Sequence, residues 1–264
     1  MIQFSRFLFF LSIFFVGTNS YAQKDSIISL DVINLQTIKL NKHSKGYKVV
    51  AISDSIIQHN TESFSSLLRF NSPIYMKEYG AGGTSSASFR GTSASNTAVI
   101  WNGININSIN NGQTGFNSLN VGLFDNINVR SGGGSIEFGS GAIGGTVHLN
   151  DELKFGDYIK NQLVVSAGSF ETYHNLYKFS FGSETTAIKV GLSYNESENN
   201  YKWLGYNLRN ENGAYYNTDF SFSIAQKLSD FSKISFYTSK YNGNRQFSGQ
   251  LPNPSAAKEK YKDF

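Results

Sequence analysis

The side chains that most often carry catalysis are few and scattered in this 264-residue chain. Its four histidines, His43, His59, His148 and His174, form no H-x-x-x-H or H-E-x-x-H pair of the kind that holds zinc. Cysteine is absent, which excludes disulfides and cysteine-based metal sites. No G-x-S-x-G elbow and no G-x-x-x-x-G-K-[ST] phosphate loop occurs, and spacing suggests no Ser/His/Asp set. We therefore predict no enzyme activity, no metal site and no cofactor.

One glycine-rich motif matches a nucleotide-binding loop. Gly139–Gly144 has the form G-x-G-x-x-G, but binding of a pyrophosphate requires a helix directly after the glycines. The residues that follow, Thr146–Leu149, have the composition of a strand. We therefore expect no dinucleotide site at this motif.

Charge and composition limit the class of protein. The net charge of +4 comes from dispersed basic residues, whereas a nucleic-acid-binding protein usually has a basic patch, so no nucleic acid partner is predicted. The chain has 22 Phe, 15 Tyr and 25 Gly, with 16% charged residues. Its mean hydropathy of −0.30 argues against a helical membrane protein. Abundant aromatic residues and glycines at modest hydropathy are typical of outer-membrane β-barrels.

The N-terminus has the three parts of a secretory signal peptide. Arg6 provides the positive charge, Phe7–Val16 is apolar, and Ser20–Ala22 has the small residues of a cleavage site after Ala22. A transmembrane anchor is the alternative, but a helix needs about 20 apolar residues to cross a bilayer. Gln23 follows the cleavage site, so a lipoprotein anchor is excluded. We predict that the protein is exported.

The mature chain changes character twice. Residues 23–45 form a polar leader, and residues 46–150 are rich in Gly, Ser and Asn with short apolar strands. The second segment predicts a small α+β domain: a helix that begins near Asn60 and is ended by Pro73, then strands that include 97–101 and 126–130.

Residues 151–264 show strict alternation with a period of two. On one face of the strands we expect Tyr173, Tyr177, Phe179, Phe181, Ile188, Val190, Leu192 and Tyr194, and on the other His174, Lys178, Ser180, Lys189, Gly191 and Ser193. Tight turns at 182–185 and 228–230 contrast with a long loop at 195–217. If the first strand, at about 162–169, rises from the periplasm, both tight turns lie on the periplasmic side, as in an outer-membrane barrel. A soluble β-sandwich with one wet face is the alternative.

Five motifs in residues 61–150 resemble, in the correct order, those of the plug domain of TonB-dependent receptors. They are Leu67-Leu68-Arg69, Ser88-Phe89-Arg90-Gly91, Val99-Ile100-Trp101-Asn102-Gly103-Ile104, Asn128-Val129-Arg130 with the glycines and Phe138-Gly139 that follow, and Gly141-Ala142-Ile143-Gly144-Gly145-Thr146-Val147. The resemblance implies an α+β plug domain at 46–150, followed by antiparallel transmembrane strands of an incomplete β-barrel. Asn102, Asn128 and Gly133 depart from the family's usual acid, Glu and Pro, so specific charge pairs do not follow from the resemblance.

The same resemblance implies roles for several residues. Arg90 and Arg130 are similar to plug arginines that pair with barrel carboxylates on later strands; a local ion pair or a solvated charge is the alternative for each. The leader would hold the TonB box, which binds the periplasmic energy-transducing TonB-type protein by strand addition. The candidate consists of Leu30, Asp31, Val32, Ile33, Asn34 and Leu35, and a simple tether is its alternative.

The activity implied by the resemblance is energy-coupled uptake of a scarce nutrient across the outer membrane, without covalent chemistry. Cobalamin or an iron–siderophore is favoured over a glycan, because the leader is too short for the additional domain of glycan importers. Candidate ligand contacts are Tyr194, Tyr201, Trp203 and Tyr206. A non-transporting surface protein that retains a plug-like domain, and a soluble secreted β-protein, are the alternatives.

The number of residues after the plug-like segment is small for a barrel. Residues 151–264 have room for about five strands, whereas closed bacterial barrels have at least about eight. The final segment, Gln246–Phe264, contains two prolines and predicts an outer loop. We therefore expect the chain to be a fragment of a longer receptor or a truncated gene product.

Overall fold

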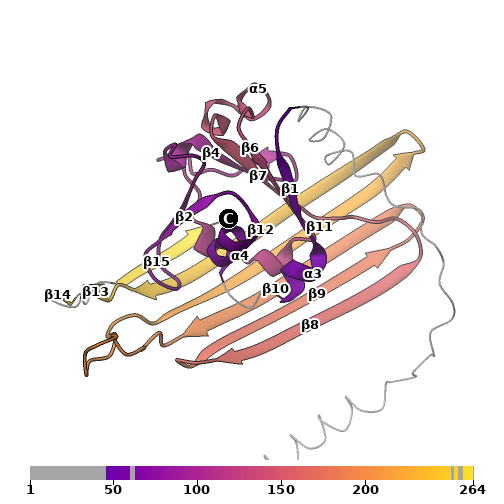
Figure 1. Cartoon of the computed structure of the whole chain (residues 1–264). Helices are drawn as coiled ribbons and strands as arrows, with labels where there is room; N and C mark the ends of the chain where they lie inside the picture. Colours follow the sequence, from indigo (N-terminus) through magenta and orange to yellow (C-terminus); the bar gives the residue numbers. More distant parts are fainter. Residues whose placement is uncertain (1–45, 60–62, 251–252, 255–257, 264) are drawn as a thin grey trace, which may run out of the picture. The chain divides into compact units, whose positions relative to one another are not determined.

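The computed structural model describes residues 46–59, 63–250, 253–254 and 258–263 (Figure 1), and side chains up to residue 248. All of them belong to one compact unit, Asn34–Phe264. The predicted signal peptide and the TonB-box candidate Leu30–Leu35 lie outside the described residues. Within the described ranges, no helix combines the length and the apolar character that crossing a bilayer requires.

The first half of the described chain, which we call the N-terminal domain, is built on a five-stranded sheet (Figure 1). The strand order is β1-β6-β7-β4-β5, and only β4 and β7 are parallel neighbours. The strands are β1 (Val49–Ile52), β4 (Thr97–Trp101), β5 (Ile104–Asn105), β6 (Asn126–Ser131) and β7 (Gly145–Asn150). Strand β7 directly follows the glycine-rich motif, so the absence of a pyrophosphate-binding helix after it is confirmed.

Short helices and one hairpin complete the N-terminal domain. They are α3 (Asp54–His59), α4 (Phe64–Asn71), β2 (Tyr75–Glu78), β3 (Ser85–Ser88), η1 (Ala94–Asn96), η2 (Phe116–Ser118), η3 (Val121–Leu123), α5 (Ser135–Phe138) and η4 (Ser140–Ala142). The prediction that a helix begins near Asn60 was wrong by a few residues. Ser63 is the N-cap of α4, and its hydroxyl accepts a hydrogen bond of 3.2 Å from Ser66 N. The helix ends before Pro73, as predicted.

The core of the N-terminal domain lies between α4 and one face of its sheet. Phe64, Leu67 and Leu68 of α4 pack in the same buried cluster as Val99, Val129, Val147 and Leu149 of the strands. The strand residues alternate along β6 and β7, so every second side chain points into this cluster. Burial of these side chains holds the short elements together.

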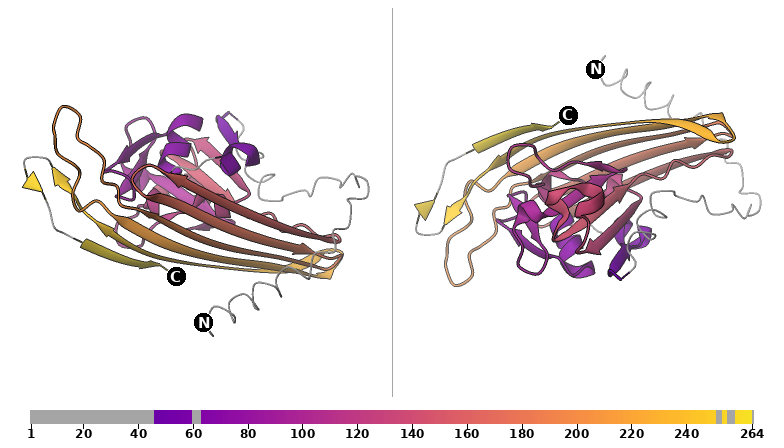
Figure 2. Two further views of the ribbon diagram at one scale, coloured as in Figure 1. Left: turned by 90° about the horizontal axis from the view of Figure 1, so that it is seen from below. Right: turned by 90° about the horizontal axis from the view of Figure 1, so that it is seen from above.

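The second half forms an antiparallel sheet of six strands in the order β15-β12-β11-β10-β9-β8, which we call the C-terminal sheet. Its strands are β8 (Tyr158–Gly168), β9 (Thr172–Gly182), β10 (Thr186–Ser197), β11 (Tyr215–Ser229), β12 (Ser232–Gln246) and β15 (Lys258–Asp263). A small hairpin, β13 (Gly249–Gln250) and β14 (Asn253–Pro254), precedes β15. The two views of Figure 2 show the long strands as one curved layer with the N-terminal domain against one face.

Three sequence predictions for this sheet need correction. The final segment, Gln246–Phe264, is not only a loop, because β15 pairs with β12 and adds a sixth strand to the expected five. The predicted first strand at about 162–169 begins earlier, at Tyr158. Strands β10 and β11 are also longer than predicted, so the long loop shrinks to residues 198–214. The predicted tight turns after β9 and β11 are confirmed.

The two faces of the C-terminal sheet differ as the alternation predicted. In β10, Ala187, Lys189 and Ser193 are buried on the inner face, toward the N-terminal domain, whereas Leu192 and Tyr194 are exposed on the outer face. The exposed outer-face side chains are Ile159, Leu163, Val165, Tyr173, Tyr177, Leu192, Tyr194, Tyr216, Phe220, Ile234 and Phe236. An apolar and aromatic band of this kind is what barrel strands present to lipid, and it argues against a soluble β-protein.

The core of the N-terminal domain yields a stability prediction. Leu149 is fully buried at the centre of the sheet, so Leu149→Ala removes packed methyl groups and leaves a cavity. We expect the free energy of unfolding to fall by about 2–5 kcal/mol, measured by urea unfolding of the detergent-solubilised protein with tryptophan fluorescence. Ile109→Ala is the matched control, because Ile109 is fully exposed, and it should change stability by less than about 0.5 kcal/mol. Equal effects of the two substitutions would contradict this core.

Candidate functional site

The N-terminal domain meets the C-terminal sheet through paired glycines and leucines. A Cβ atom at Gly191 of β10 would lie 2.5 Å from Leu123 Cδ2 of η3. In the same way, a Cβ atom at Gly122 would lie 2.6 Å from Leu176 Cδ2 of β9. Each leucine occupies the space that the side chain of any residue larger than glycine would fill. The missing side chain of glycine therefore allows the two backbones to approach closely.

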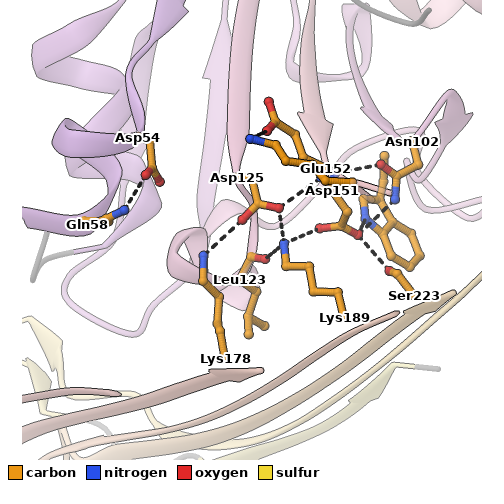
Figure 3. A network of polar contacts seen from close by, with 12 residues as sticks. Asp54, Gln58, Asn102, Leu123, Asp125, Asp151, Glu152, Lys178, Lys189 and Ser223 are labelled. Atoms are coloured by element: carbon orange, nitrogen blue, oxygen red, sulfur yellow. Dashed lines mark hydrogen bonds and ion pairs between the residues drawn. The ribbon is translucent and has the colours of Figure 1, made fainter. Parts of the chain in front are cut away.

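A cluster of two lysines and two aspartates lies beside this contact (Figure 3). We call Asp125, Asp151, Lys178 and Lys189 the lysine–aspartate cluster. Lys189 Nζ lies 2.6 Å from Asp125 Oδ2 and 3.1 Å from Asp151 Oδ1, and it donates a third hydrogen bond of 2.9 Å to Leu123 O. Lys178 Nζ lies 3.2 Å from the other oxygen of Asp125. Both lysines come from the C-terminal sheet and both aspartates from the N-terminal domain, so the cluster joins the two.

Neutral donors complete the coordination of Asp151 (Figure 3). Asp151 Oδ2 accepts hydrogen bonds from Asn102 Nδ2 at 3.0 Å, Trp101 Nε1 at 3.2 Å and Ser223 Oγ at 3.1 Å. The backbone N–H of Asp151 donates in turn to Asn102 Oδ1 at 2.8 Å. Both carboxylate oxygens therefore have partners, which a buried charge requires.

The topology of the N-terminal sheet brings the two aspartates together. Asp125 precedes β6 and Asp151 follows β7, and these strands are antiparallel neighbours, so the start of one lies beside the end of the other. Asp125 N donates to Asn150 O at 3.1 Å, and Glu152 N donates to Asp125 Oδ2 at 2.9 Å. The two carboxylates are thereby held at one edge of the sheet.

Electrostatics keep the cluster charged. Burial alone would raise the pKa of the Asp125 carboxyl, but the ammonium groups of Lys189 and Lys178 outweigh this effect and lower its pKa to about 2. The Lys189 and Asp151 side chains are only 3% and 4% exposed, so each charge depends on the other for compensation. With two positive and two negative groups, the cluster is neutral as a whole.

The sequence predicted half of this cluster. Alternation placed Lys178 and Lys189 on the face opposite the aromatic residues, which is the face that meets the N-terminal domain. Asp125 and Asp151 were not singled out, because each is a single acid beside a short strand. Only the pairing of β6 with β7 makes them neighbours.

The two predicted contact arginines do not join the C-terminal sheet within the described residues. Arg130 is 2% exposed and donates a hydrogen bond of 2.6 Å from Nη2 to Gly133 O; its guanidinium also lies 3.5 Å from Glu137 and 4.9 Å from the ring centroid of Tyr47. Arg90 is exposed and has a positive φ of 50°. Pairing of either arginine with a carboxylate on a further strand stays a prediction.

A cavity of about 570 Å³ lies between the N-terminal domain and the inner face of the C-terminal sheet. Its lining comes from α4, the β2–β3 loop and the η2–η3 segment on one side, and from β9 to β12 on the other. Phe170, in the turn between β8 and β9, lines the cavity and is in edge contact with the ring of Tyr201. In the part of the chain that the structure describes, no three His, Asp or Glu side chains are placed to hold a metal ion.

The predicted ligand contacts separate into two groups. Tyr201, Trp203 and Tyr206 lie in the long loop 198–214, and the rings of Tyr201 and Trp203 are 5.4 Å apart. Tyr194 lies on the outer face of β10 and donates a hydrogen bond to Glu196 on the same face. This face points away from the cavity, and a ligand contact at Tyr194 stays a prediction.

Comparison with known proteins gives one family and a set of similar structures. Residues 42–146 match the family model described as the TonB-dependent receptor plug domain. The described fold is similar to the copper transporter OprC (TM-score 0.62, 15% identity, 76% of this chain and 31% of that chain). It is also similar to the siderophore receptor PirA from Acinetobacter baumannii (TM-score 0.60, 20% identity, 78% and 32%). A third is the pyoverdine outer membrane receptor FpvA from Pseudomonas aeruginosa PAO1 (TM-score 0.59, 13% identity, 75% and 28%).

The similarity covers only part of those proteins. This chain spans about a third or less of the length of each of these three structures. A search of curated protein sequences found no match. At these identities the likeness concerns the fold: an N-terminal domain of the plug type against antiparallel strands like those of part of a barrel.

Removal of Lys189 tests the cluster. Lys189→Met leaves the buried Asp151 and the half-buried Asp125 without their shared counter-ion, so the free energy of unfolding should fall by about 3–5 kcal/mol, measured by urea unfolding in detergent. Lys160→Met is the control, since Lys160 lies exposed on the edge strand β8 of the same sheet and has no ion pair among the described residues; this substitution should lower the free energy of unfolding by less than about 0.5 kcal/mol. If both variants unfold at the same urea concentration, the cluster does not hold the interface.

His148 gives the N-terminal domain a predicted pH dependence. Burial, reinforced by the charge of Arg130, lowers the pKa of His148 from 6.5 to about 4. The unfolded chain therefore binds the proton more tightly than the folded one. The contribution of neutral His148 to the free energy of unfolding should be fully present above about pH 6.5. It should be lost as the pH falls toward 4, which lowers the free energy of unfolding by on the order of 3 kcal/mol.

Urea midpoints measured between pH 4 and pH 8 check this dependence. His148→Gln should reduce the loss of stability below pH 6.5, whereas His59→Gln, on the exposed end of α3, should leave it unchanged. A His148→Gln variant with the full wild-type pH slope would show that another group titrates.

Proposed function

We propose that this protein, whose residues 42–146 match the family model of the TonB-dependent receptor plug domain, binds a scarce nutrient at the bacterial outer membrane and imports it with energy from a TonB-type protein. Cobalamin and iron–siderophores are the proposed ligand classes. The observation that carries the proposal is a plug held against barrel-type strands by one neutral ionic cluster, with a cavity between the two.

The position of the leader suggests how energy would reach this interface. The leader precedes β1, which among the described strands pairs only with β6, from Val49↔Arg130 to Ile52↔Ile127. Asp125 lies directly before β6, at the point where Ile52 of β1 pairs with Ile127. A pull on the leader would therefore act first on four residue pairs and then on the residue that binds both lysines.

The chemistry of the cluster fits repeated release and return. An ion pair separates without breaking a covalent bond, and its charges can be taken over by water as the domain moves. The leucine–glycine contacts at Gly122 and Gly191 define the position to which the N-terminal domain would return. The apolar outer face of the C-terminal sheet supports a location in the outer membrane.

A reversible link between the plug and the sheet tests the transport proposal. The chain has no cysteine, so Leu123→Cys combined with Gly191→Cys introduces a single possible bridge. Truncation of Leu123 removes the Cδ2 atom that lies 2.5 Å from a Cβ at Gly191. Ser221 Oγ also lies 2.5 Å from that Cβ, so the serine hydroxyl must rotate away to admit the second cysteine. With the bridge closed by oxidation or by a short bis-maleimide, we expect ligand binding to persist and energy-dependent uptake to stop.

Uptake should return when the disulfide is reduced. The Leu123→Cys single variant, which keeps Gly191 and cannot form the bridge, is the control and should transport equally under oxidising and reducing conditions. The measurement is accumulation of radiolabelled cobalamin or iron chelate in cells that make the protein. Undiminished uptake by the bridged protein would refute import through movement of the plug and favour a non-transporting binding protein.

A further inference from the structure

The inner face of the C-terminal sheet presents rows of polar side chains to the cavity. His174, Asn195 and Asn217 are cross-strand neighbours on β9, β10 and β11. His174 Nδ1 contacts Asn195 Oδ1, and Asn195 Nδ2 donates to Asn217 Oδ1 at 2.7 Å. One row further along, the hydroxyls of Thr172 and Ser197 are 2.8 Å apart. This part of the wall therefore offers amides and hydroxyls, with both donors and acceptors.

The N-terminal domain adds a donor that lacks an acceptor. Asn120 lines the cavity, and its Oδ1 accepts a hydrogen bond of 3.0 Å from Gly122 N. Its Nδ2 is buried and has no hydrogen-bond partner among the described residues. A buried donor without a partner is unfavourable, so a ligand that brings a carbonyl or hydroxyl oxygen to this point would gain binding energy.

The charged groups of the lining offer little to an anion. Arg69 is paired with Glu78 at 3.2 Å, and the Asp219 carboxyl group, which accepts a hydrogen bond of 2.7 Å from Ser193, supplies no cation. Among the described residues, no lysine lines the cavity. The two buried lysines of the same sheet, Lys178 and Lys189, already bind Asp125 and Asp151.

Aromatic rings and size complete the description of the cavity. The rings of Phe170, Tyr215 and Tyr241 are part of the lining and provide apolar surface between the polar groups. The volume of about 570 Å³ lies within the usual range for small-molecule sites. Polar groups that orient a ligand, set among aromatic surfaces, are the composition expected of a selective site.

From this geometry we infer that the cavity binds an uncharged ligand rich in amide or hydroxyl groups, and that it discriminates against polyanionic iron chelates. The inference rests on the proposed function and selects among its ligand classes. Cyanocobalamin, which is neutral overall and carries several amide side chains, has the required chemistry. A ferric tris-catecholate, which is trianionic, would find no unpaired lysine or arginine among the described residues of the lining.

Equilibrium binding to outer-membrane vesicles that contain the protein as the cell makes it tests the inference. The probes are cyanocobalamin, a neutral malto-oligosaccharide and a ferric tris-catecholate, with vesicles that lack the protein as background. We expect at least one neutral probe to bind at least about tenfold more tightly than the tris-catecholate. A tris-catecholate that binds more tightly than both neutral probes, or no binding of either neutral probe, would overturn the inference.

A pair of matched substitutions tests the role of Asn120. Asn120→Asp keeps the oxygen that accepts from Gly122 N but removes the Nδ2 donor, and should weaken the neutral probe about tenfold. Asn111→Asp is the control: its Oδ1 accepts from Gln113 N at 3.0 Å in the same way, but it is exposed and outside the cavity. Equal binding by the two variants would remove Asn120 from the site and overturn the inference.

The bridged Leu123→Cys, Gly191→Cys protein separates failure of this inference from failure of the proposed function. If the tris-catecholate binds best and its uptake stops when the bridge closes, the receptor function stands and the ligand class is wrong. If a neutral probe binds as expected but its uptake is the same with the bridge closed and open, the inferred ligand class is supported and the proposal of transport by plug movement is wrong.

Discussion

The ammonium group of Lys189 lies where the N-terminal domain meets the C-terminal sheet, and it contacts two carboxylates and a backbone carbonyl at once. Its burial constrains the residues around it, because a charge removed from water must be compensated by polar or charged groups of fixed position. Asp125 and Asp151 can compensate it only if β6 and β7 pair in their observed register. The C-terminal sheet can present it only if β10 turns its odd-numbered residues inward. This one interaction therefore couples the register of β6 and β7 in the N-terminal sheet to the orientation of the β10 side chains in the C-terminal sheet.

The inner face of β10 carries three different tasks in order along the strand. Lys189 provides the charged contact, Gly191 receives Leu123, and Asn195 and Ser197 line the cavity. Because successive inward residues of a strand lie about 7 Å apart, the charged contact of Lys189, the contact of Gly191 with Leu123 and the cavity are close together but distinct. A displacement of the N-terminal domain that frees Leu123 from Gly191 would also change the distance from Asp125 to Lys189. Attachment of the domain and the shape of the cavity are thus linked mechanically.

The structure gives physical reasons for one departure from the family pattern. Asn102 stands where the resembling sequences often have an acid, and its side chain both donates to Asp151 Oδ2 and accepts from Asp151 N. A carboxylate at this position could not donate, and it would place a second negative charge against Asp151. Asn102 also has a φ of 47°, a left-handed conformation that asparagine tolerates better than most residues. Within the described residues, the ion pairs between the two parts have their acids on the N-terminal domain and their lysines on the C-terminal sheet.

Local pattern determined much of this protein. The period of two placed Lys178, Lys189 and the aromatic residues on opposite faces, and strands such as Thr97–Trp101 were predicted with their observed bounds, because alternation and β-propensity are properties of neighbouring residues. The partners of those lysines were not predictable, since Asp125 and Asp151 are separated in sequence and meet only through antiparallel pairing. The sixth strand was missed because a proline-containing segment has little strand pattern of its own, and the edge of β12 supplies its hydrogen bonds. The chain alone thus decided which side chains face inward; tertiary structure decided which of them meet, because contact between distant residues depends on register and layer packing.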